Sequence, residues 1–536
     1  MDGSTAPEGY EVEKCGEQEE NEEEQTTPSE STDPLLQIFR MPKKMQLAEK
    51  SKNSDELIEK NREFWRETLR NQKITKILAP MVDQSELAFR MFTRKYGAQL
   101  TFTPMIHAHL FVNDGTYRRN SLAMVKADRP LVVQFCANKV DTFLSACRLV
   151  EGLCDGVDLN LGCPQMVAKR GRYGSWLQDE VDLICEMVSA VRDYCTLPVS
   201  CKIRVREDRN QTVEYAKRLV DAGATMLTVH GRTRDMKGAD TGLADWTRIR
   251  DVVEAVGEKV PVLANGNIQF PGDVERCMSA TGAVGVMSAE GLLYNPLIFD
   301  DPNAHVETWK IAAEYLEYAR RFHAGTSAVR AHVFRICHHS LLEYEDLRMR
   351  VSLEHRIEDF ENIVEELGKR AKADQEKGKE EETKAREYFE KIRHGELEMD
   401  ATEVSKQPHW ISKPYFRLKE VAKESIVGEG EKTFRAKQKE KLAQTAKEMG
   451  VSLKQARKRE RRQLTGARIL EAKKQKFPPC ARCGQPAGQG CTNQKCKKCC
   501  RYQSKHEASD CKGHRYTFST APGLDSNNSV PVATES

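Results

Sequence analysis

Short apolar runs alternate with longer amphipathic stretches between residues 74 and 289, and this alternation constrains the fold of the chain most. Apolar runs separated by helical stretches of about ten to fifteen residues indicate βα units and a parallel sheet. The expected strands are 74–80, 100–104, 131–135, 156–161, 199–204, 226–231, 260–265 and 284–289. Eight such units fit an α/β fold of the TIM (β/α)8 barrel type better than a doubly wound sheet.

Composition divides the rest of the chain. The first 34 residues hold twelve acidic side chains and one lysine, whereas residues 432–476 hold sixteen Lys and Arg against four Glu. Acidic, aromatic-poor sequence predicts disorder, and apolar positions at helical spacing predict packed helices. The expected parts are a disordered acidic leader at 1–50, the barrel at 74–300, a small helical domain at 305–370, a charged linker at 371–431, a basic helix at 432–476, a cysteine-rich module at 480–514 and a disordered tail at 515–536.

The chain has no run of about 18 apolar residues, which excludes a transmembrane helix. Its first twenty residues lack the basic and apolar regions of a secretory signal. We therefore expect an intracellular protein, cytoplasmic, nuclear or both. In such a reducing compartment a cluster of cysteines indicates metal ligands. The alternatives are disulfides or a redox relay.

Seven cysteines and a histidine lie at metal-ligand spacings near the C-terminus. Their number suits two tetrahedral zinc ions with four ligands each. A segment so short and so poor in apolar residues requires metal to fold. The sequence leaves the pairing of ligands open, with His506 as an alternative to one of them. The candidate ligands are Cys480, Cys483, Cys491, Cys496, Cys499, Cys500, Cys511 and His514.

Polar side chains follow several of the expected strands, at the edge where a barrel carries its active site. The set contains a cation, amides and small-residue turns, but no run of carboxylates suited to a hydrolase or a magnesium site. It favours a planar, polar cofactor with a phosphate, because Lys202 could face a ring that becomes anionic on reduction. The turn at 265–267 could offer N–H groups to phosphate. The residues are Gln134, Asn160, Lys202, His230, Arg232, Asn265, Gly266 and Asn267.

Strand 156–161 ends in a Gly-Cys-Pro turn, which places Cys163 at the mouth of the expected barrel. An exposed thiol is mostly protonated at neutral pH and can serve as a proton donor as well as a nucleophile. A buried cysteine behind a structural turn is the alternative.

Seven motifs together resemble the flavin-dependent tRNA-dihydrouridine synthases, in particular the eukaryotic branch assigned to D-loop uridines 16 and 17. The resemblance covers roughly residues 74–370, and LNLGCPQ with its downstream KRG is its most specific part. The motifs are APMVDQSELAFR (79–90), QFCANKVDTF (134–143), DLNLGCPQMVAKRGRYGSWL (158–177), CKIRVR (201–206), VHGRTR (229–234), LANGNI (263–268) and GVMSAEGLLYNP (285–296).

This resemblance implies FMN as prosthetic group, NADPH or NADH as reductant, and reduction of the uracil C5=C6 bond in tRNA. It implies that Cys163 protonates C5, and that Asn160, Lys169 and Arg232 contact the substrate. Many bacterial relatives carry Gly-Arg near the flavin phosphate where this chain has Ala289-Glu290, so backbone amides or another base must replace that contact. The implied FMN residues are Pro80, Met81, Val82, Gln134, Lys202, His230, Asn265, Gly266, Asn267 and Ala289.

Two other functions are compatible with parts of the sequence. The chain could be an RNA-binding protein in which the barrel is only a scaffold, or a flavoenzyme that acts on a free pyrimidine. A free pyrimidine needs neither the basic run nor the zinc ligands. The basic stretch 432–476 favours tRNA phosphate as a partner. The alternatives are that it is only a solvated charged face or that it is a nuclear import signal.

Overall fold

The computed structural model describes residues 33–300 and 305–416, and in the C-terminal part residues 443–444, 448–450, 452, 455, 480–483, 487–488, 491–507, 509–511 and 514. The chain separates into two compact units, 1–428 and 429–536. Of the helices in these ranges, none has the length and apolar content needed to cross a membrane.

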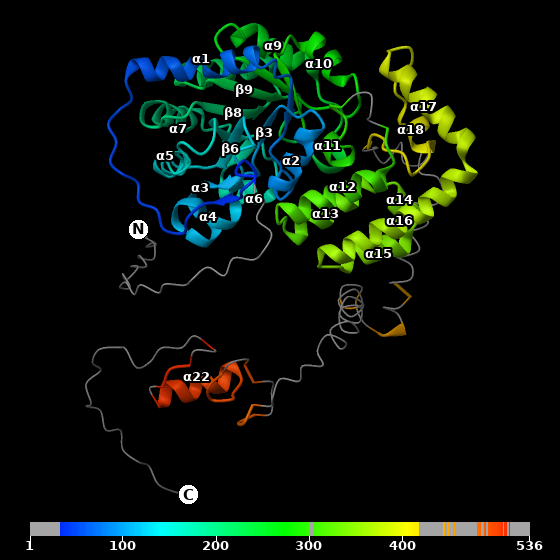
Figure 1. The fold of residues 1–536 in the computed structure, drawn as a ribbon. Helices are drawn as coiled ribbons and strands as arrows, with labels where there is room; N and C mark the ends of the chain where they lie inside the picture. The colour runs from blue at the N-terminus through cyan, green and yellow to red at the C-terminus, as the bar shows by residue number, and fades with distance from the viewer. Residues whose placement is uncertain are drawn as a thin grey trace, which may run out of the picture. The chain divides into compact units, whose positions relative to one another are not determined.

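Eight parallel strands close a TIM barrel in the first unit (Figure 1). Pairing of β2 with both β11 and β3, and of β3 with β6, completes the ring. All eight expected strands occur, within two residues of the expected ends. They are β2 (Lys76–Leu78), β3 (Leu100–Phe102), β6 (Leu131–Cys136), β7 (Gly156–Leu161), β8 (Val199–Arg204), β9 (Met226–His230), β10 (Val262–Asn265) and β11 (Gly285–Ser288).

Alternation along each strand divides the apolar residues between two cores. Val133 of β6 and Leu159 of β7 pack outward against the helices, whereas Val132 of β6 and Leu263 of β10 fill the barrel. Strands β6, β7 and β8 are buried on both faces. β6 is almost continuously apolar, whereas β7 and β8 alternate between apolar residues of the outer core and buried polar residues of the opposite face. The outer helices are α2 (Leu87–Lys95), α5 (Val140–Arg148), α7 (Val181–Tyr194), α8 (Arg209–Ala222), α9 (Trp246–Val256) and α10 (Asp273–Thr281).

Helix α8 shows how local sequence sets these boundaries. The Asp208 side chain accepts a hydrogen bond from the N–H of Gln211 at 2.7 Å and caps the N-terminus. Gly223, with φ +117°, ends the helix in the left-handed conformation. Tyr215 and Leu219 form part of its buried face. Short elements at the strand ends are β4 (Ile106–His107), α3 (Ala108–Asn113), α4 (Gly115–Ser121), α6 (Met166–Gly171), the 3-10 helices Gly174–Trp176 and Gly238–Asp240, and α11 (Glu290–Tyr294).

Helix α1 (Asp55–Asn71) closes the N-terminal end of the barrel. Its Trp65 is fully buried and belongs to the core inside the barrel. A Cβ atom on Gly156, the first residue of β7, would lie 2.8 Å from the Trp65 ring, so this indole fills the space that the glycine leaves. The opposite, C-terminal end of the barrel remains open for a site.

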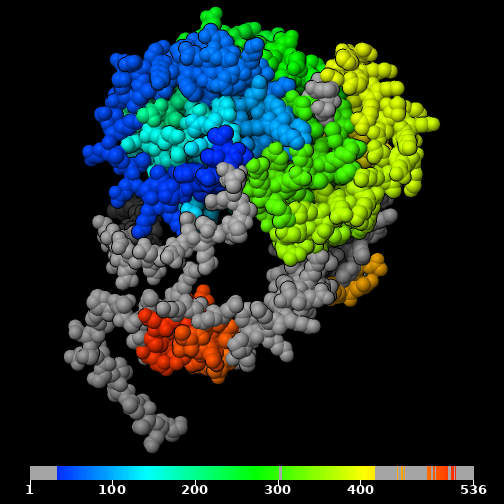
Figure 2. Space-filling model, viewed as in Figure 1, coloured from blue at the N-terminus to red at the C-terminus, as the bar shows by residue number. Residues whose placement is uncertain are grey.

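Helices after the barrel form a lobe beside it (Figure 2). The carboxylate of Glu86, which precedes α2, accepts hydrogen bonds from Tyr315 Oη at 3.0 Å and from His332 Nε2 at 3.1 Å. These buried contacts join the lobe to the barrel. Its helices are α12 (Thr308–Arg321), α13 (Thr326–Ile336), α14 (Ser340–Glu343), α15 (Glu345–Leu353), α16 (Ile357–Lys377), α17 (Lys379–Arg393) and α18 (Ala401–Lys406).

The structure differs from the predicted linker at 371–431. One buried cluster contains Ala385, Phe389 and Ile392 of α17 together with Phe270, which follows strand β10 of the barrel. Residues 371–411 are therefore a packed part of the lobe. The remainder, 417–431, lies outside the described residues.

The predicted leader at 1–50 also needs correction, because β1 (Phe39–Arg40) pairs antiparallel with β5 (Ala123–Met124) and Met41 is buried. Residues 1–32, most of the predicted basic helix 432–476 and the predicted tail 515–536 lie outside the described residues. Within the described residues of the cysteine-rich module, α22 spans Lys497–His506.

Candidate active site and metal centres

A cavity of about 610 Å³ opens where the barrel strands end. Its size lies in the range of small-molecule and cofactor sites. Of the fourteen residues that the sequence assigns to catalysis, cofactor and substrate, all but Lys169 line it. The predicted residues in the cavity follow or belong to seven of the eight barrel strands.

Cys163 stands at the edge of this cavity in a turn that is held from two sides. Asn160 Oδ1 accepts hydrogen bonds from the N–H groups of Gly162 at 3.2 Å and Cys163 at 3.0 Å. Ser175 donates its N–H and its hydroxyl to the Cys163 carbonyl. A Cβ atom on Gly174, whose φ is +65°, would lie 2.7 Å from that carbonyl oxygen, so only glycine fits there. The partly exposed thiol is thus fixed in place.

Three cationic side chains crowd the cavity. Burial, and next the repulsion from Arg204, lowers the pKa of Lys202 to about 8, and Lys202 Nζ donates to Asn265 Oδ1 at 2.8 Å. Burial, and next Arg232, lowers the pKa of Arg204 to about 10. The pKa of His230 is far below its ordinary value, because of burial and then the same three cations, so its imidazole is neutral. An anionic ligand would relieve this repulsion.

Arg204 is absent from the predicted set. Its Nε donates to the Gly162 carbonyl at 2.8 Å, so it contacts the turn that carries Cys163. It follows Lys202 by two residues on β8, and residues at that spacing share one face of a strand. This spacing was the signal that could have identified it.

The cavity residues fit FMN. A cation, neutral amides and a side-chain-free turn suit a planar ring and a phosphate. Gly266, with φ +114°, approaches its neighbours closely, since an added Cβ atom would lie 2.6 Å from the Ala244 Cβ atom. Glu290 lines the same cavity, and so does Arg335 of α13, a base that could replace the arginine found in bacterial relatives.

The predicted substrate residue Lys169 lies elsewhere, on α6, with its Nζ 4.6 Å from the centroid of the Trp176 ring. The Arg234 guanidinium and Lys237 Nζ lie 4.7 and 5.0 Å from the same ring. Trp176 packs in one cluster with Cys163. The three cations therefore form a basic rim beside Cys163.

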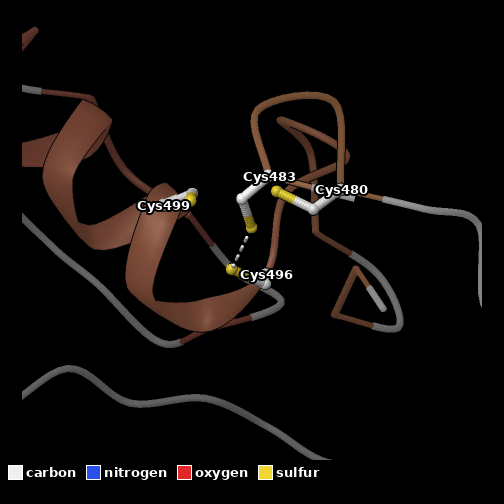
Figure 3. A group of neighbouring side chains, drawn as sticks. All are labelled: Cys480, Cys483, Cys496 and Cys499. Atoms are coloured by element: carbon white, nitrogen blue, oxygen red, sulfur yellow. Dashed lines mark hydrogen bonds between the residues drawn. The ribbon is translucent and has the colours of Figure 1, made fainter. Parts of the chain in front are cut away.

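The eight predicted metal ligands form two groups of four, each with its ligand atoms within 4.8 Å of one another. Cys480, Cys483, Cys496 and Cys499 make the first group (Figure 3), and Cys491, Cys500, Cys511 and His514 make the second. The Sγ atoms of Cys483 and Cys496 are 3.6 Å apart, and those of Cys491 and Cys511 are 3.8 Å apart. A tetrahedral Zn²⁺ with Zn–S bonds near 2.3 Å requires about 3.8 Å.

The two groups interleave along the chain and meet on α22. Cys499 points to the first group and its neighbour Cys500 to the second. Gly488 lies against His514, where an added Cβ atom would come within 2.3 Å of Nε2. Both groups could hold metal, and among the described residues His514 completes the second group; the His506 side chain lies outside the described residues.

Comparison with known proteins adds independent information. The family described as dihydrouridine synthase (Dus) matches residues 77–392. A mouse protein named tRNA-dihydrouridine(16/17) synthase [NAD(P)(+)]-like is 39% identical over 462 residues, covering 85% of this chain and 90% of the relative. The Saccharomyces cerevisiae tRNA-dihydrouridine(16/17) synthase [NAD(P)(+)] is 41% identical over 363 residues, covering 64% of this chain and 84% of the relative. The similarity therefore extends beyond the barrel.

Proposed function

The chain belongs to the dihydrouridine synthase family, and from this premise we propose that it uses FMN and NADPH or NADH to reduce the C5=C6 bond of D-loop uridines 16 and 17 in tRNA. The observation that supports this most is the cavity itself, where Cys163 faces a group of buried cations and amides. The similarity to relatives named for uridines 16 and 17 supports the choice of nucleotide.

The residues of the cavity have separate roles in this proposal. When bound, FMN would supply the hydride for uracil C6. Lys202 and Asn265 would hold the polar edge of the ring, and the Gly266–Asn267 turn with Arg335 would hold its phosphate. Pro80, Met81, Val82 and Ala289 supply apolar contacts.

Cys163 would donate its proton to C5, so that one hydride and one proton saturate the double bond. Lys202 and Arg204 line the same cavity as Cys163. Arg232 is a further cation at the same cavity. The neutral His230 does not compete as an acid.

A stacked base cannot reach the floor of such a cavity, so the uridine must be extruded at a cost of a few kcal/mol. The basic rim of Lys169, Arg234 and Lys237 is suited to the phosphates that flank an extruded nucleotide. We propose further that the metal-binding module and the basic run 432–476 add affinity for tRNA.

Replacement of Cys163 by alanine tests the proposal. We expect uridine reduction to fall by about 10²- to 10⁴-fold, the usual contribution of a general acid, while flavin content and NADPH oxidation persist. Cys185→Ala is the matched control, because Cys185 is a partly exposed thiol on α7 that does not line the cavity. Dihydrouridine formation at the wild-type rate would remove Cys163 from the mechanism. A colourless wild-type protein would instead favour an RNA-binding protein with a non-catalytic barrel.

A further inference from the structure

A line of hydrogen bonds runs from the Cys163 turn into the barrel. Asn160 Oδ1 accepts from the N–H groups of Gly162 and Cys163. The Asn160 amide then donates from Nδ2 to Gln134 Oε1 at 2.8 Å. Gln134 donates from Nε2 to Asp158 Oδ2 at 2.8 Å. The buried carboxylate of Asp158 thus lies three hydrogen bonds away from the backbone of Cys163.

The direction of every bond in this line is determined by its ends. The two backbone N–H groups can only donate, so Asn160 must turn its oxygen toward them and its NH2 group toward Gln134. Gln134 must then accept with its oxygen and donate its own NH2 group inward. Asp158 accepts that bond with one oxygen and accepts from Ser200 Oγ with the other, at 2.7 Å.

Water has little access to these partners. Gln134, Asp158 and Ser200 are fully buried and Asn160 is 8% exposed. A buried polar group that loses its partner remains unsatisfied, which makes the arrangement rigid. Burial raises the pKa of Asp158 to about 6, which leaves it a carboxylate, and therefore an acceptor, at neutral pH.

We propose that Asp158 is a positioning residue, which acts through Gln134 and Asn160 to hold the turn that places the Cys163 thiol. Asn160 then serves mainly to position Cys163, because both ends of its amide are engaged, and this modifies the substrate contact that the resemblance implies for it. The proposal rests on the proposed function of Cys163 as proton donor. It gives a reason for an acidic side chain, otherwise costly inside a barrel, at this depth.

Reversing the line of hydrogen bonds tests the proposal. In Asn160→Asp the new carboxylate can accept from the two N–H groups but cannot donate to Gln134. Gln134 must turn round, and its carbonyl oxygen then faces the Asp158 carboxylate. Adding Asp158→Asn supplies an NH2 group that donates to Gln134, while the new carbonyl still accepts from Ser200. The double variant has the shape and net charge of the wild type, with the two central bonds reversed.

We expect Asn160→Asp to slow dihydrouridine formation by about ten- to a hundredfold in single turnovers with pre-reduced enzyme and saturating tRNA, as displaced catalytic groups do. The double variant should recover at least about tenfold of that loss. Asn160→Asp combined with Ser200→Ala is the matched control, because it also alters the surroundings of Asp158 but supplies no donor, and it should show no recovery.

Flavin content and the midpoint of thermal unfolding are measured for every variant. A double variant no faster than Asn160→Asp, or an Asn160→Asp protein as fast as the wild type, overturns the proposal. If Asn160→Asp fails to fold, the double variant must fold with the wild-type midpoint; otherwise the proposal is again overturned. A wild-type protein that makes no dihydrouridine would refute the proposed function instead, and the unfolding midpoints would still report the coupling between positions 158 and 160.

Discussion

Cys195 of the barrel and Cys480 of the C-terminal module are the same side chain in opposite surroundings. In the barrel, burial raises the pKa of Cys195 to about 12, so it remains a thiol and fills space. In the module, desolvation acts to raise the pKa of Cys480, but the N–H groups of Cys496, Arg482 and Cys483 outweigh it and lower the pKa to about 6. A metal binds the thiolate.

The two regions also differ in the interactions that stabilise their folds. The barrel has a continuous apolar core, inside the strand ring and between strands and helices. Among the described residues of the module, the buried apolar side chains are four cysteines and Ala487. We conclude that hydrophobic burial folds the barrel, and we propose that metal ligation folds the module.

Removal of metal should give the largest difference between the two regions, because it should unfold the module and leave the barrel folded. Structural zinc contributes an apparent free energy of about 10–16 kcal/mol at neutral pH to domains of this kind. We expect a chelator to abolish amide-exchange protection in 480–514 while the thermal midpoint of the barrel stays constant. Zinc added back should restore the protection. If 480–514 stays protected in metal-free protein, the module has a fold of its own.

The converse experiment acts on the barrel core. Trp65→Ala should lower the free energy of unfolding of the barrel by about 3–5 kcal/mol, as large-to-small core substitutions do, because the indole is fully buried. Metal content of the module should not change. Arg62→Ala is the control on the same helix, at a side chain that is 56% exposed. Equal effects of the two substitutions in urea denaturation would show that the buried indole stabilises the barrel no more than an exposed side chain of α1 does.

The smallest expected effect concerns tRNA affinity. A chain that ends at residue 425 should keep its flavin and its NADPH oxidation but bind tRNA more weakly, with a shallower slope of log K against log salt. Each phosphate that Lys or Arg no longer neutralises reduces the slope by about 0.7–0.9. Chelation of metal from the full chain should reproduce part of this change. Identical affinities of the two chains across several salt concentrations would leave the basic run as a solvated face or an import signal.

The strands could be predicted because apolar residues recur in short runs, or at every second position as in β7 and β8, between stretches with helical spacing. The packing of the lobe beyond residue 371 could not be predicted, because Phe389 and Ile392 lie among many Lys and Glu residues. Composition over such a window averages away a narrow buried stripe. Phe389 and Ile392 are buried because they pack in one cluster with Phe270, which is more than a hundred residues away in the sequence.

The sequence predicts which residues line the cavity, but it does not predict which contacts those residues make. Strand-end polar residues converge in any barrel, which is why the cavity contains Lys202 and Asn265 as expected. Lys169 faces Trp176 because α6 turns it there, and spacing along the chain does not determine that direction. Similarly, the role of Asp158 depends on two amides whose orientation only the folded barrel defines.

Adjacent Cys499 and Cys500 belong to different metal groups. Successive side chains on a helix point about 100° apart, so α22 can serve both groups only in its helical form. We propose that metal bound to either group would order the helix and present the ligand of the other group, so that the second ion would bind more tightly than the first. Zinc uptake by this module should therefore be sigmoidal, and protein carrying a single ion should be scarce at every stage of a titration.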